Sequence, residues 1–412
     1  MSTVVPFKAI TYHPKSIPDI AQVMTPPYDV IPAGEDQKYR DRSPYNIAHV
    51  ILPQGPDDDY SRSAALLNKW LEVGVLVEDA KPHFYLYQQD FEVEGRAYSR
   101  RTLMAQVELR DFSEGIIRPH ENTHGKHKAD RLRILKKTQI NLSHIFGMVK
   151  DPSGFLAGRY EEWSYKPALY SATLEDGVKH SLWRVDSEDA TSVSAFFSDK
   201  PIYIVDGHHR YESSLAYARE IGALGNPQHP ANYMMFAIAN TFDPSLVVFP
   251  THRWVKAAEM PTAIQKSDVQ LTFQLSPTTF EQIAQFIREP SDEPRFGLYA
   301  WGETFFCSPY DWKKECSTIG VGVAQLAVTW SDEFLLRKLG KIEPDTRSQK
   351  IVYDKSATAL WEKKGPNDLI VFHAAPPIDA ITRVSDEKGF MPQKSTYFYP
   401  KLFAGLTMRK AY

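Results

Sequence analysis

The spacing of apolar residues along the chain switches repeatedly between the period of a helix and that of a strand. Leu66, Leu67, Trp70 and Leu71 recur at helical spacing, which predicts a helix with one apolar face. Residues 83–109 have the pattern of a β-hairpin that turns at residues 94–96. The same signals predict a basic helix at 128–139, a strand at 202–205, a helix at 209–222, strands at 233–242 and 246–249, a helix at 279–288 and a strand at 369–372.

Strands and helices are interleaved and no internal repeat is visible, so the sequence predicts an α+β fold of mixed sheets with helices. At 412 residues the chain is long enough for two or three domains of about 150 residues each. We expect an N-terminal α+β region at 1–150, a core region at 151–270 and a C-terminal α+β region at 271–412. These three regions are expected to pack as one or two compact units.

Composition narrows the classes of function. A net charge of −3 gives the chain no general attraction for nucleic acid or for anionic membranes. The sequence lacks an apolar run long enough to span a bilayer, and its N-terminus lacks the pattern of a targeting segment. Only 2 cysteines occur, which excludes a disulfide framework and suits a reducing compartment. We therefore expect a cytoplasmic protein with no membrane partner, and nucleic acid is not an expected ligand.

The segment at 202–212 carries the clearest candidate chemistry. A β-branched strand ends at Asp206, and a helix follows Gly207 with His208, His209 and Arg210 in its first turn. Free N–H groups and the positive dipole end make a helix start an anion site. Glycine permits close backbone approach, and the planar guanidinium of arginine suits phosphate. We predict a phosphate site here, and the alternative is an ordinary strand-to-helix turn with solvated polar side chains.

A second candidate is the loop around His120 and Glu121. Residues 120–124 spell H-E-x-x-H, but zinc-protease chemistry needs both histidines on one face of a helix with apolar flanks. Gly125 and the charged residues after it would end such a helix within one turn. We therefore interpret His120 and Glu121 as an acid–base pair on a site loop, and a merely solvated basic loop is the alternative.

The helix that follows this loop concentrates positive charge. Between Arg118 and Lys137 there are seven arginines and lysines and two acids, and 7 − 2 gives an excess of +5. Such an excess would attract an anion, although charged runs are more often solvated helix faces. Arg131 and Arg133 lie on different helix faces, so we expect only one of them, Arg131, to reach a ligand.

Two later motifs fit the same chemistry. Thr251-His252-Arg253 places a basic triplet at the end of an apolar strand, and Lys394-Ser395-Thr396 places a lysine and two hydroxyl groups in a loop before an aromatic strand. Arginine, lysine and hydroxyl groups can all bind phosphate oxygens. We therefore include Arg253, Lys394, Ser395 and Thr396 among the candidate cofactor-binding residues.

Several of these segments carry a resemblance to known families. The segment Asp206–Arg210 resembles the Gly-x-x-Arg box of the ParB and sulfiredoxin superfamily, which includes free serine kinases and in which a strand–box–helix element holds nucleotide phosphates. The whole chain resembles the domain-of-unknown-function family numbered 1015. The landmarks, in order, are residues 26–31 (PPYDVI), 43–47 (SPYNI), 120–121 (HE), 130–132 (DRL), 206–212 (DGHHRYE), 251–253 (THR), 391–396 (MPQKST) and 400–401 (PK).

Departures from these patterns limit the chemistry. Sulfiredoxin has its catalytic cysteine inside the box, where this chain has His208, so thiol repair chemistry is excluded while phosphate binding is retained. In ParB proteins a glutamate–asparagine box follows the arginine box, whereas Glu121-Asn122 precedes it here. The sequence also shows no helix-turn-helix with a basic recognition face.

Together these features favour a nucleotide-dependent small-molecule phosphotransferase that resembles a kinase. Gly207, His208, His209 and Arg210 would bind the phosphates of ATP, ADP or CTP. Asp206 and Glu121 would hold Mg²⁺ or accept the proton of the acceptor, and His120 would orient one of them. We further expect the loop at 120–121 to fold over the helix start at 208–210, since each segment alone supplies half of a catalytic site.

Two alternatives stay open. The first is a nucleotide-switched, ParB-like regulatory protein that binds without useful turnover. The second is a metal-dependent hydrolase that uses His120, Glu121, Asp206 and His208. The nucleotide, the acceptor and any homo-oligomeric state are left open by the sequence.

Overall fold

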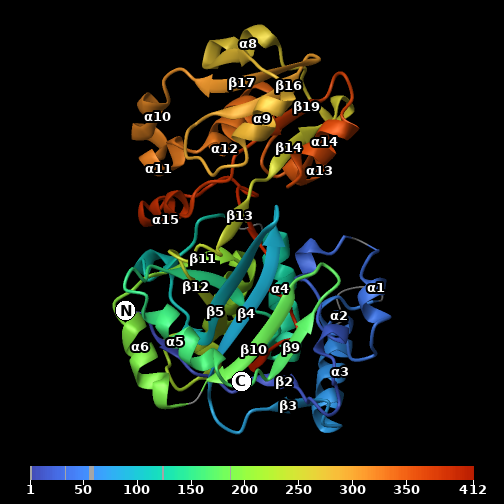
Figure 1. The fold of residues 1–412 in the computed structure, drawn as a ribbon, viewed down its shortest axis with the longest axis vertical. Coiled ribbons are helices and arrows are strands. Elements are labelled where there is room, and N and C mark those ends of the chain that lie inside the picture. Colours follow the sequence, from blue (N-terminus) through green and yellow to red (C-terminus); the bar gives the residue numbers. More distant parts are fainter. Residues whose placement is uncertain (1, 33, 55–59, 123–124, 186) are drawn as a thin grey trace. The chain divides into compact units, whose positions relative to one another are not determined.

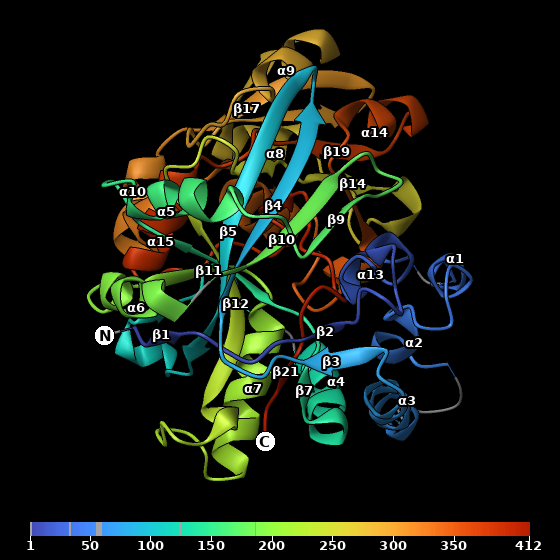
Figure 2. The same cartoon turned by 60° about the horizontal axis from the view of Figure 1, so that its bottom comes forward.

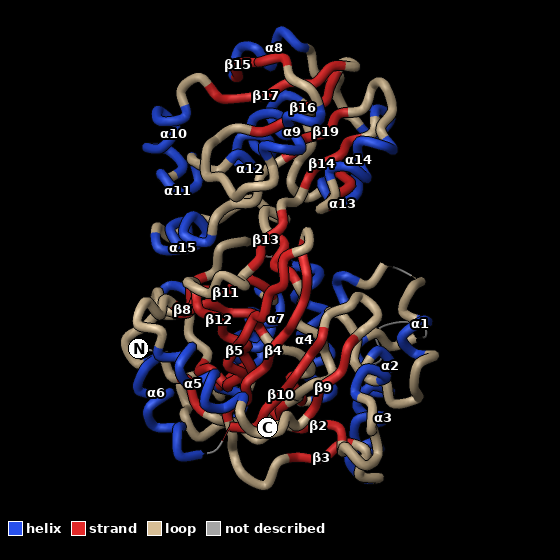
Figure 3. The backbone as a smooth tube through the Cα atoms, in the orientation of Figure 1, coloured by secondary structure: helices blue, strands red, loops and turns tan. Residues whose placement is uncertain are grey.

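The computed structural model describes residues 2–32, 34–54, 60–122, 125–185 and 187–412. Contacts divide the chain into two compact units. Unit 1 comprises Met1–Pro119, Thr123–Leu246 and Pro400–Tyr412, and unit 2 comprises His120–Asn122 and Val247–Tyr399. Each unit contains helices and sheets, which confirms the predicted α+β class (Figures 1 and 3). Unit 1 contains most of the predicted regions 1–150 and 151–270. Unit 2 contains most of the predicted region 271–412.

Unit 1 is built on a nine-stranded sheet. The strand order is β6 (Ile117–Arg118), β11 (Ile202–Asp206), β8 (Ile145–Val149), β12 (Tyr233–Asn240), β5 (Arg96–Glu108), β4 (Phe84–Val93), β10 (Lys179–Val185) and β9 (Tyr170–Thr173), and β1 (Val4–Val5) pairs with β5. β11 with β6 and β12 with β8 are parallel pairs, and the other pairs are antiparallel. The predicted hairpin is confirmed as β4–β5. Its turn residues Glu94 and Gly95 have φ values of 50° and 78°, as a tight two-residue hairpin turn requires.

Helices and two small sheets complete unit 1. The helices are α1 (Gln37–Arg40), α2 (Ala48–Ile51), α3 (Ser61–Glu72), α4 (Gly125–Thr138), α5 (Phe155–Ser164), α6 (Ala190–Phe197) and α7 (His208–Glu220), and the small sheets pair β2 (Ile10–Tyr12) with β3 (Leu76–Glu78) and β7 (Ile140–Asn141) with β21 (Arg409–Lys410). The predicted basic helix and the helix after Gly207 are confirmed as α4 and α7. These two helices lie side by side (Figure 2), and the Ser213 hydroxyl donates to the Lys128 carbonyl at 2.8 Å.

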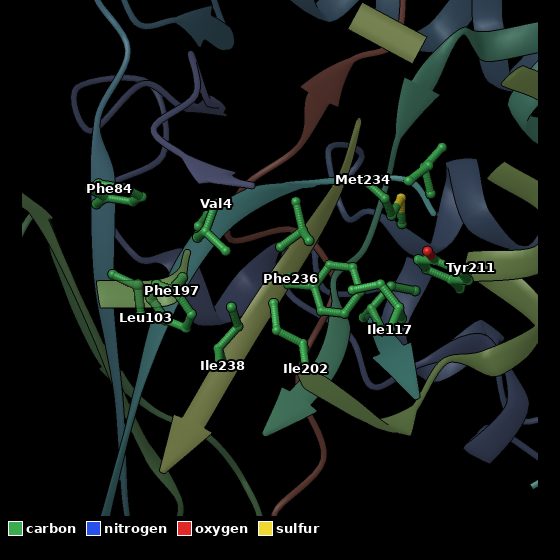
Figure 4. Close-up of a cluster of buried hydrophobic side chains, with 14 of the residues drawn as sticks. Val4, Phe84, Leu103, Ile117, Phe197, Ile202, Tyr211, Met234, Phe236 and Ile238 are labelled. Atoms are coloured by element: carbon green, nitrogen blue, oxygen red, sulfur yellow. The ribbon is translucent and has the colours of Figure 1, made fainter. Parts of the chain in front are cut away.

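An apolar core fixes α7 against the large sheet. Ile117, Ile202, Tyr211, Phe236 and Ile238 are all fully buried in one cluster, in which Tyr211 of α7 lies near side chains of β6, β11 and β12 (Figure 4). Burial of such side chains stabilises the fold by about 1.5–3 kcal/mol each. The Tyr211 hydroxyl donates to the Arg110 carbonyl at 2.7 Å, so its polar atom is also satisfied. The start of α7 therefore has a fixed position at the end of β11.

Unit 2 is built on a six-stranded antiparallel sheet. Its order is β15 (Phe273–Pro277), β17 (Glu303–Pro309), β16 (Phe296–Ala300), β19 (Leu369–Phe372), β14 (His252–Val255) and β18 (Ile351–Asp354). Its helices are α8 (Lys266–Thr272), α9 (Phe280–Phe286), α10 (Trp312–Ile319), α11 (Val321–Ala324), α12 (Ala327–Thr329), the π-helical η7 (Trp330–Leu339), α13 (Arg347–Lys350), α14 (Ala357–Lys363) and α15 (Ile378–Asp386). The predicted helix after Thr279 is confirmed as α9, which Thr279 and Gln282 close with a capping box.

A short antiparallel pair lies next to two of the points where the chain passes from one unit to the other. β13 (Val247–Phe249) pairs with β20 (Tyr397–Tyr399), and Val247 lies opposite Tyr399. The chain leaves unit 1 after Leu246 and rejoins it at Pro400, directly next to these paired residues. In the part of the chain that the structure describes, no helix is both long and apolar enough to cross a membrane.

Candidate functional site

The junction between β11 and α7 has the backbone geometry that its sequence predicts. Gly207 precedes the helix with φ 93°, in the left-handed region that favours glycine. A Cβ atom at Gly207 would lie 3.0 Å from Cζ and Nη2 of Arg210. Glycine is therefore required here twice, for the conformation of the turn and for the close approach of the Arg210 guanidinium.

Asp206 is bracketed by two cations. Arg210 Nη2 donates to Asp206 Oδ1 at 3.2 Å, and Lys401 Nζ donates to Oδ2 at 2.6 Å. The three side chains are largely buried, with exposures of 18% for Asp206, 11% for Arg210 and 15% for Lys401. Arg210 Nη1 also donates to Ser143 Oγ at 3.1 Å and to the His144 carbonyl. These three side chains together carry two positive charges and one negative charge.

These ion pairs limit the roles that Asp206 can have at the junction. Burial alone would raise the pKa of the Asp206 carboxyl, but the charges of Lys401, Arg210 and His208 hold that pKa well below its usual range. A carboxylate with a lowered pKa is a weak proton acceptor at neutral pH. Both of its oxygens already accept from cations, so it does not fit a resident Mg²⁺ ligand in this arrangement. The geometry favours Asp206 as the residue that positions Arg210 and Lys401.

Lys401 is a functional candidate that the sequence did not single out. Its segment is anchored by two buried side chains of the β4–β5 hairpin. Arg100 Nη2 donates to the Pro400 carbonyl at 2.5 Å, and Gln89 Nε2 donates to the Lys401 carbonyl at 3.0 Å. Residues 400–401 were visible only as a landmark of the family resemblance. Because 195 residues separate Lys401 from Asp206, no local pattern could have paired them.

Arg131 and Arg210, both predicted as cofactor-binding residues, line one pocket of unit 1. The pocket has an empty volume of about 520 Å³ including its open mouth. The Arg131 guanidinium lies 3.7 Å from the centre of the Tyr28 ring, which also lines the pocket. Burial and the neighbouring Asp29 carboxylate raise the pKa of Tyr28 to about 12, so its hydroxyl stays protonated. The structure therefore brings together two of the predicted residues, from α4 and α7.

In unit 2 the structure brings together the His120 loop and the Lys-Ser-Thr loop. His120 is fully buried, and its Nε2 lies 3.2 Å from Thr396 Oγ1 and 3.7 Å from Glu121 Oε1. The Ser395 N–H donates to Glu121 Oε1 at 3.3 Å, and the Met391 N–H donates to the His120 carbonyl at 2.7 Å. These segments are more than 270 residues apart in sequence. The resulting cluster combines an imidazole, a carboxylate and two hydroxyl groups.

The other predicted residues of unit 2 are Arg253 and Lys394. Arg253 is fully buried, and its guanidinium donates to Asp332 Oδ1 at 3.0 Å and to the Gln393 carbonyl at 3.2 Å. Breaking a buried ion pair of this kind typically costs about 3–5 kcal/mol. Lys394 is exposed, at φ 58°. The phosphate-binding roles of Arg253 and Lys394 stay predictions, and the contacts of Arg253 favour a structural role.

The two groups of predicted residues belong to different units, so the expectation that they form one site stays a prediction. His124, the second histidine of the H-E-x-x-H spelling, lies outside the described residues. Among the residues that the structure does describe, no group of three or more histidine, cysteine, aspartate or glutamate side chains could hold a metal ion. The roles of His208 and His209 as phosphate ligands also stay predictions. His208 is buried at the start of α7, and the His209 carbonyl accepts from Ser213 Oγ at 2.7 Å.

The fold and the junction define an α+β protein in which two cations pair with one carboxylate at a strand–glycine–helix turn. The model of a family described as a protein of unknown function, DUF1015, matches residues 4–328, and the chain belongs to this family. No curated protein matches the sequence. Lys401 comes from the part of the chain that follows the matched residues.

Several solved structures are distantly similar. A variant of free serine kinase in complex with ADP has a TM-score of 0.39 and 14% identity, covering 71% of this chain and 86% of that one. Free serine kinase in complex with AMP has a TM-score of 0.38 and 14% identity, with the same coverage. SbnI with a C-terminal truncation, from Staphylococcus aureus, has a TM-score of 0.36 and 10% identity, covering 75% of this chain and 88% of that one. These likenesses are too distant to assign a function.

Proposed function

We propose that this protein binds a nucleotide at the β11–α7 junction and transfers a phosphoryl group from it to a small-molecule acceptor. The observation that carries the proposal is the group of Arg210 and Lys401, held by Asp206 at the positive end of α7. Phosphoryl transfer depends mainly on positioning and on neutralising the charge of the phosphates. A helix N-terminus with two neighbouring cations supplies both.

In this proposal each group at the junction has a stated task. The N–H groups of the first turn of α7 and the side chains of Arg210 and Lys401 bind phosphate oxygens. Asp206 stays ionised and keeps both cations in place. The bond from the terminal phosphorus to its bridging oxygen breaks, and a bond to the acceptor oxygen forms. The acceptor proton passes to a general base.

A nucleotide-binding protein without turnover is the second candidate function. It is favoured by the lowered pKa of Asp206, because the junction then holds cations for an anion but no effective proton acceptor of its own. Incubation with ATP, Mg²⁺ and a mixture of candidate acceptors separates the two. Turnover that requires an added acceptor supports the phosphotransferase, and binding with slow acceptor-free hydrolysis supports the regulatory protein.

Substitution of the two cations tests the phosphate site. We expect Arg210→Ala to weaken ADP binding by about 2 kcal/mol, the size of hydrogen bonds to a charged group, and Lys401→Met to weaken it similarly. The matched control is Lys410→Met, which removes another lysine of unit 1 that is ion-paired at 2.8 Å, with Glu78. The measurement is calorimetric titration, with thermal unfolding of each variant to confirm the fold. Equal ADP affinity in all four proteins would refute the assignment.

A further inference from the structure

The pocket of unit 1 has two planar groups in its wall and a mainly apolar remainder. The planar groups are the Tyr28 ring and the Arg131 guanidinium, 3.7 Å apart. The apolar side chains include Ile134 and Leu135 of α4, Leu142 and Met234. Ligand pockets with such a lining take the apolar body of a ligand and use a few polar groups to orient it.

Arg131 is held in a way that suits contact with a flat ring better than contact with phosphate. Its Nε donates to Asp130 Oδ2 at 2.9 Å, and its Nη2 donates to the Tyr60 hydroxyl at 3.3 Å. The Asp130 carboxylate therefore holds Arg131 in place, while its other oxygen lies 3.7 Å from Arg133 Nη2, and the Arg131 side chain is only 9% exposed. The Tyr28 ring lies over one face of this fixed guanidinium. The opposite face of a planar guanidinium is a surface on which an aromatic ring can stack.

Arg210 links this pocket to the junction. It lines the pocket and also donates to Asp206, next to the N-terminus of α7. A molecule in the pocket that reaches Arg210 therefore has its anionic end at the junction. The ligand must combine a flat, largely apolar part with a negatively charged part.

From these observations we propose that the pocket binds the base of the nucleotide, with the ring against Arg131 and Tyr28. This inference rests on the proposed function, since the phosphates of the same ligand would lie at the junction. It changes the role of Arg131 from a phosphate ligand to a base-stacking residue.

The polar groups in the pocket wall also set how well bases are distinguished. The Ser213 hydroxyl donates to backbone carbonyls, Ser214 Oγ donates to Met234 Sδ at 3.3 Å, and Asn141 Oδ1 accepts from Arg409 at 3.1 Å. Strong discrimination needs side chains that hydrogen-bond the edge of the ligand. The two serine hydroxyls and Asn141 Oδ1 are engaged within the protein, and Ser143 Oγ accepts from Arg210 Nη1 at 3.1 Å. We expect adenosine, guanosine and cytidine to bind with affinities within about tenfold of one another.

The test compares a ligand that has only the base and sugar with one that has only phosphates. Adenosine and inorganic triphosphate are each titrated into the wild-type protein by calorimetry, and both are expected to bind. Tyr28→Leu and Arg131→Met should each weaken adenosine binding about tenfold, because stacking contributes on that order. Both variants should leave triphosphate binding within about twofold. Lys137→Met is the matched control, since Lys137 lies on the same helix with an exposed side chain and should change neither affinity.

The outcomes separate this inference from the proposed function. Triphosphate binding without adenosine binding would overturn the base pocket and leave the proposed phosphate site standing. Adenosine binding without triphosphate binding would overturn the proposed phosphate site and leave the base pocket standing. Decanoate that binds where adenosine does not would assign the pocket to an aliphatic anion and overturn the inference. Unchanged adenosine affinity in both variants would overturn it as well, and the wild-type titrations decide the question even if a variant fails to fold.

Discussion

Three of the buried histidines in the described part of the chain each lie near an arginine that is itself buried or half-buried. His144 is near Arg210, His180 is near Arg100 and His252 is near Arg253. Burial is the main cause that lowers the pKa of each histidine to about 3, and the neighbouring guanidinium lowers it further. All three imidazoles are therefore neutral in the folded protein at neutral pH. Uncharged histidines therefore lie beside arginines in each of the two units.

This arrangement predicts a loss of stability in weak acid. In the unfolded chain a histidine has a pKa of about 6.5, so below that pH the unfolded state binds protons that the folded state does not. The stabilisation is fully present above about pH 6.5 and is lost as the pH falls toward the folded pKa of about 3. Each histidine contributes a slope of up to about 1.4 kcal/mol per pH unit.

Urea unfolding at a series of pH values between 7.5 and 5 measures this slope. In the His144→Gln variant the slope of the unfolding free energy against pH should be smaller than in the wild-type protein, by about the amount that one proton contributes. A free energy of unfolding that is flat across this range would contradict the neutral assignment of the buried histidines.

At the scale of elements, α7 has a left-handed glycine on each side. Gly207 precedes the helix with φ 93°, and Gly222 follows it with φ 69°. A Cβ at Gly207 would meet the Arg210 guanidinium, whereas a Cβ at Gly222 would meet no atom within 4 Å. A side chain at either position would strain the backbone, because both have positive φ. Only a side chain at Gly207 would also displace the Arg210 guanidinium.

The pair of glycines gives a matched test of the junction. Gly207→Ala and Gly222→Ala should each destabilise the protein by about 1 kcal/mol or more, because alanine is strained at positive φ. Only Gly207→Ala should weaken ADP binding, since it displaces the arginine that would bind phosphate. Thermal unfolding and calorimetric titration measure the two effects. Equal ADP affinity in both variants would show that the position of Arg210 does not matter for the ligand.

Local signals carried the predictions that the structure confirms. The β4–β5 hairpin, the strand ending at Asp206, α7 and the cap at Thr279 each depend on residues within a few positions of one another. What the sequence could not show depends on distant parts of the chain. Lys401 meets Asp206 through the path of the C-terminal segment, and burial of Arg253 beside Asp332 follows from packing in unit 2.

At the scale of the whole molecule, unit 2 interrupts unit 1 between adjacent points. Val247 and Tyr399 are paired, so the residues at which unit 1 breaks off and resumes lie close together. Domains inserted at such points can often be removed, because the remaining ends need little linker.

We therefore expect unit 1 to fold without unit 2. A chain in which a short glycine-serine linker replaces residues 247–399 should unfold cooperatively and should bind ADP within a few-fold of the full chain, since the proposed phosphate site and pocket are in unit 1. Residues 120–122 would remain as a short loop without their partners at Met391 and Ser395. Circular dichroism on denaturation and calorimetry measure the outcome. A folded unit 1 that has lost ADP binding would show that unit 2 residues are required.

The return of the chain to unit 1 has a consequence for biosynthesis. Residues of the final segment join unit 1 at separate places: Ala404 pairs with Thr25, Met408 with Ile10, and the buried Arg409 donates to the Tyr233 carbonyl at 3.0 Å. A ribosome makes these residues after all of unit 2, so unit 1 cannot be completed before unit 2 has been made. A nascent chain must keep an unfinished apolar surface in unit 1 until residues 400–412 have been made. A stop codon shortly before residue 401 would therefore delete Lys401 and leave unit 1 exposed to proteases.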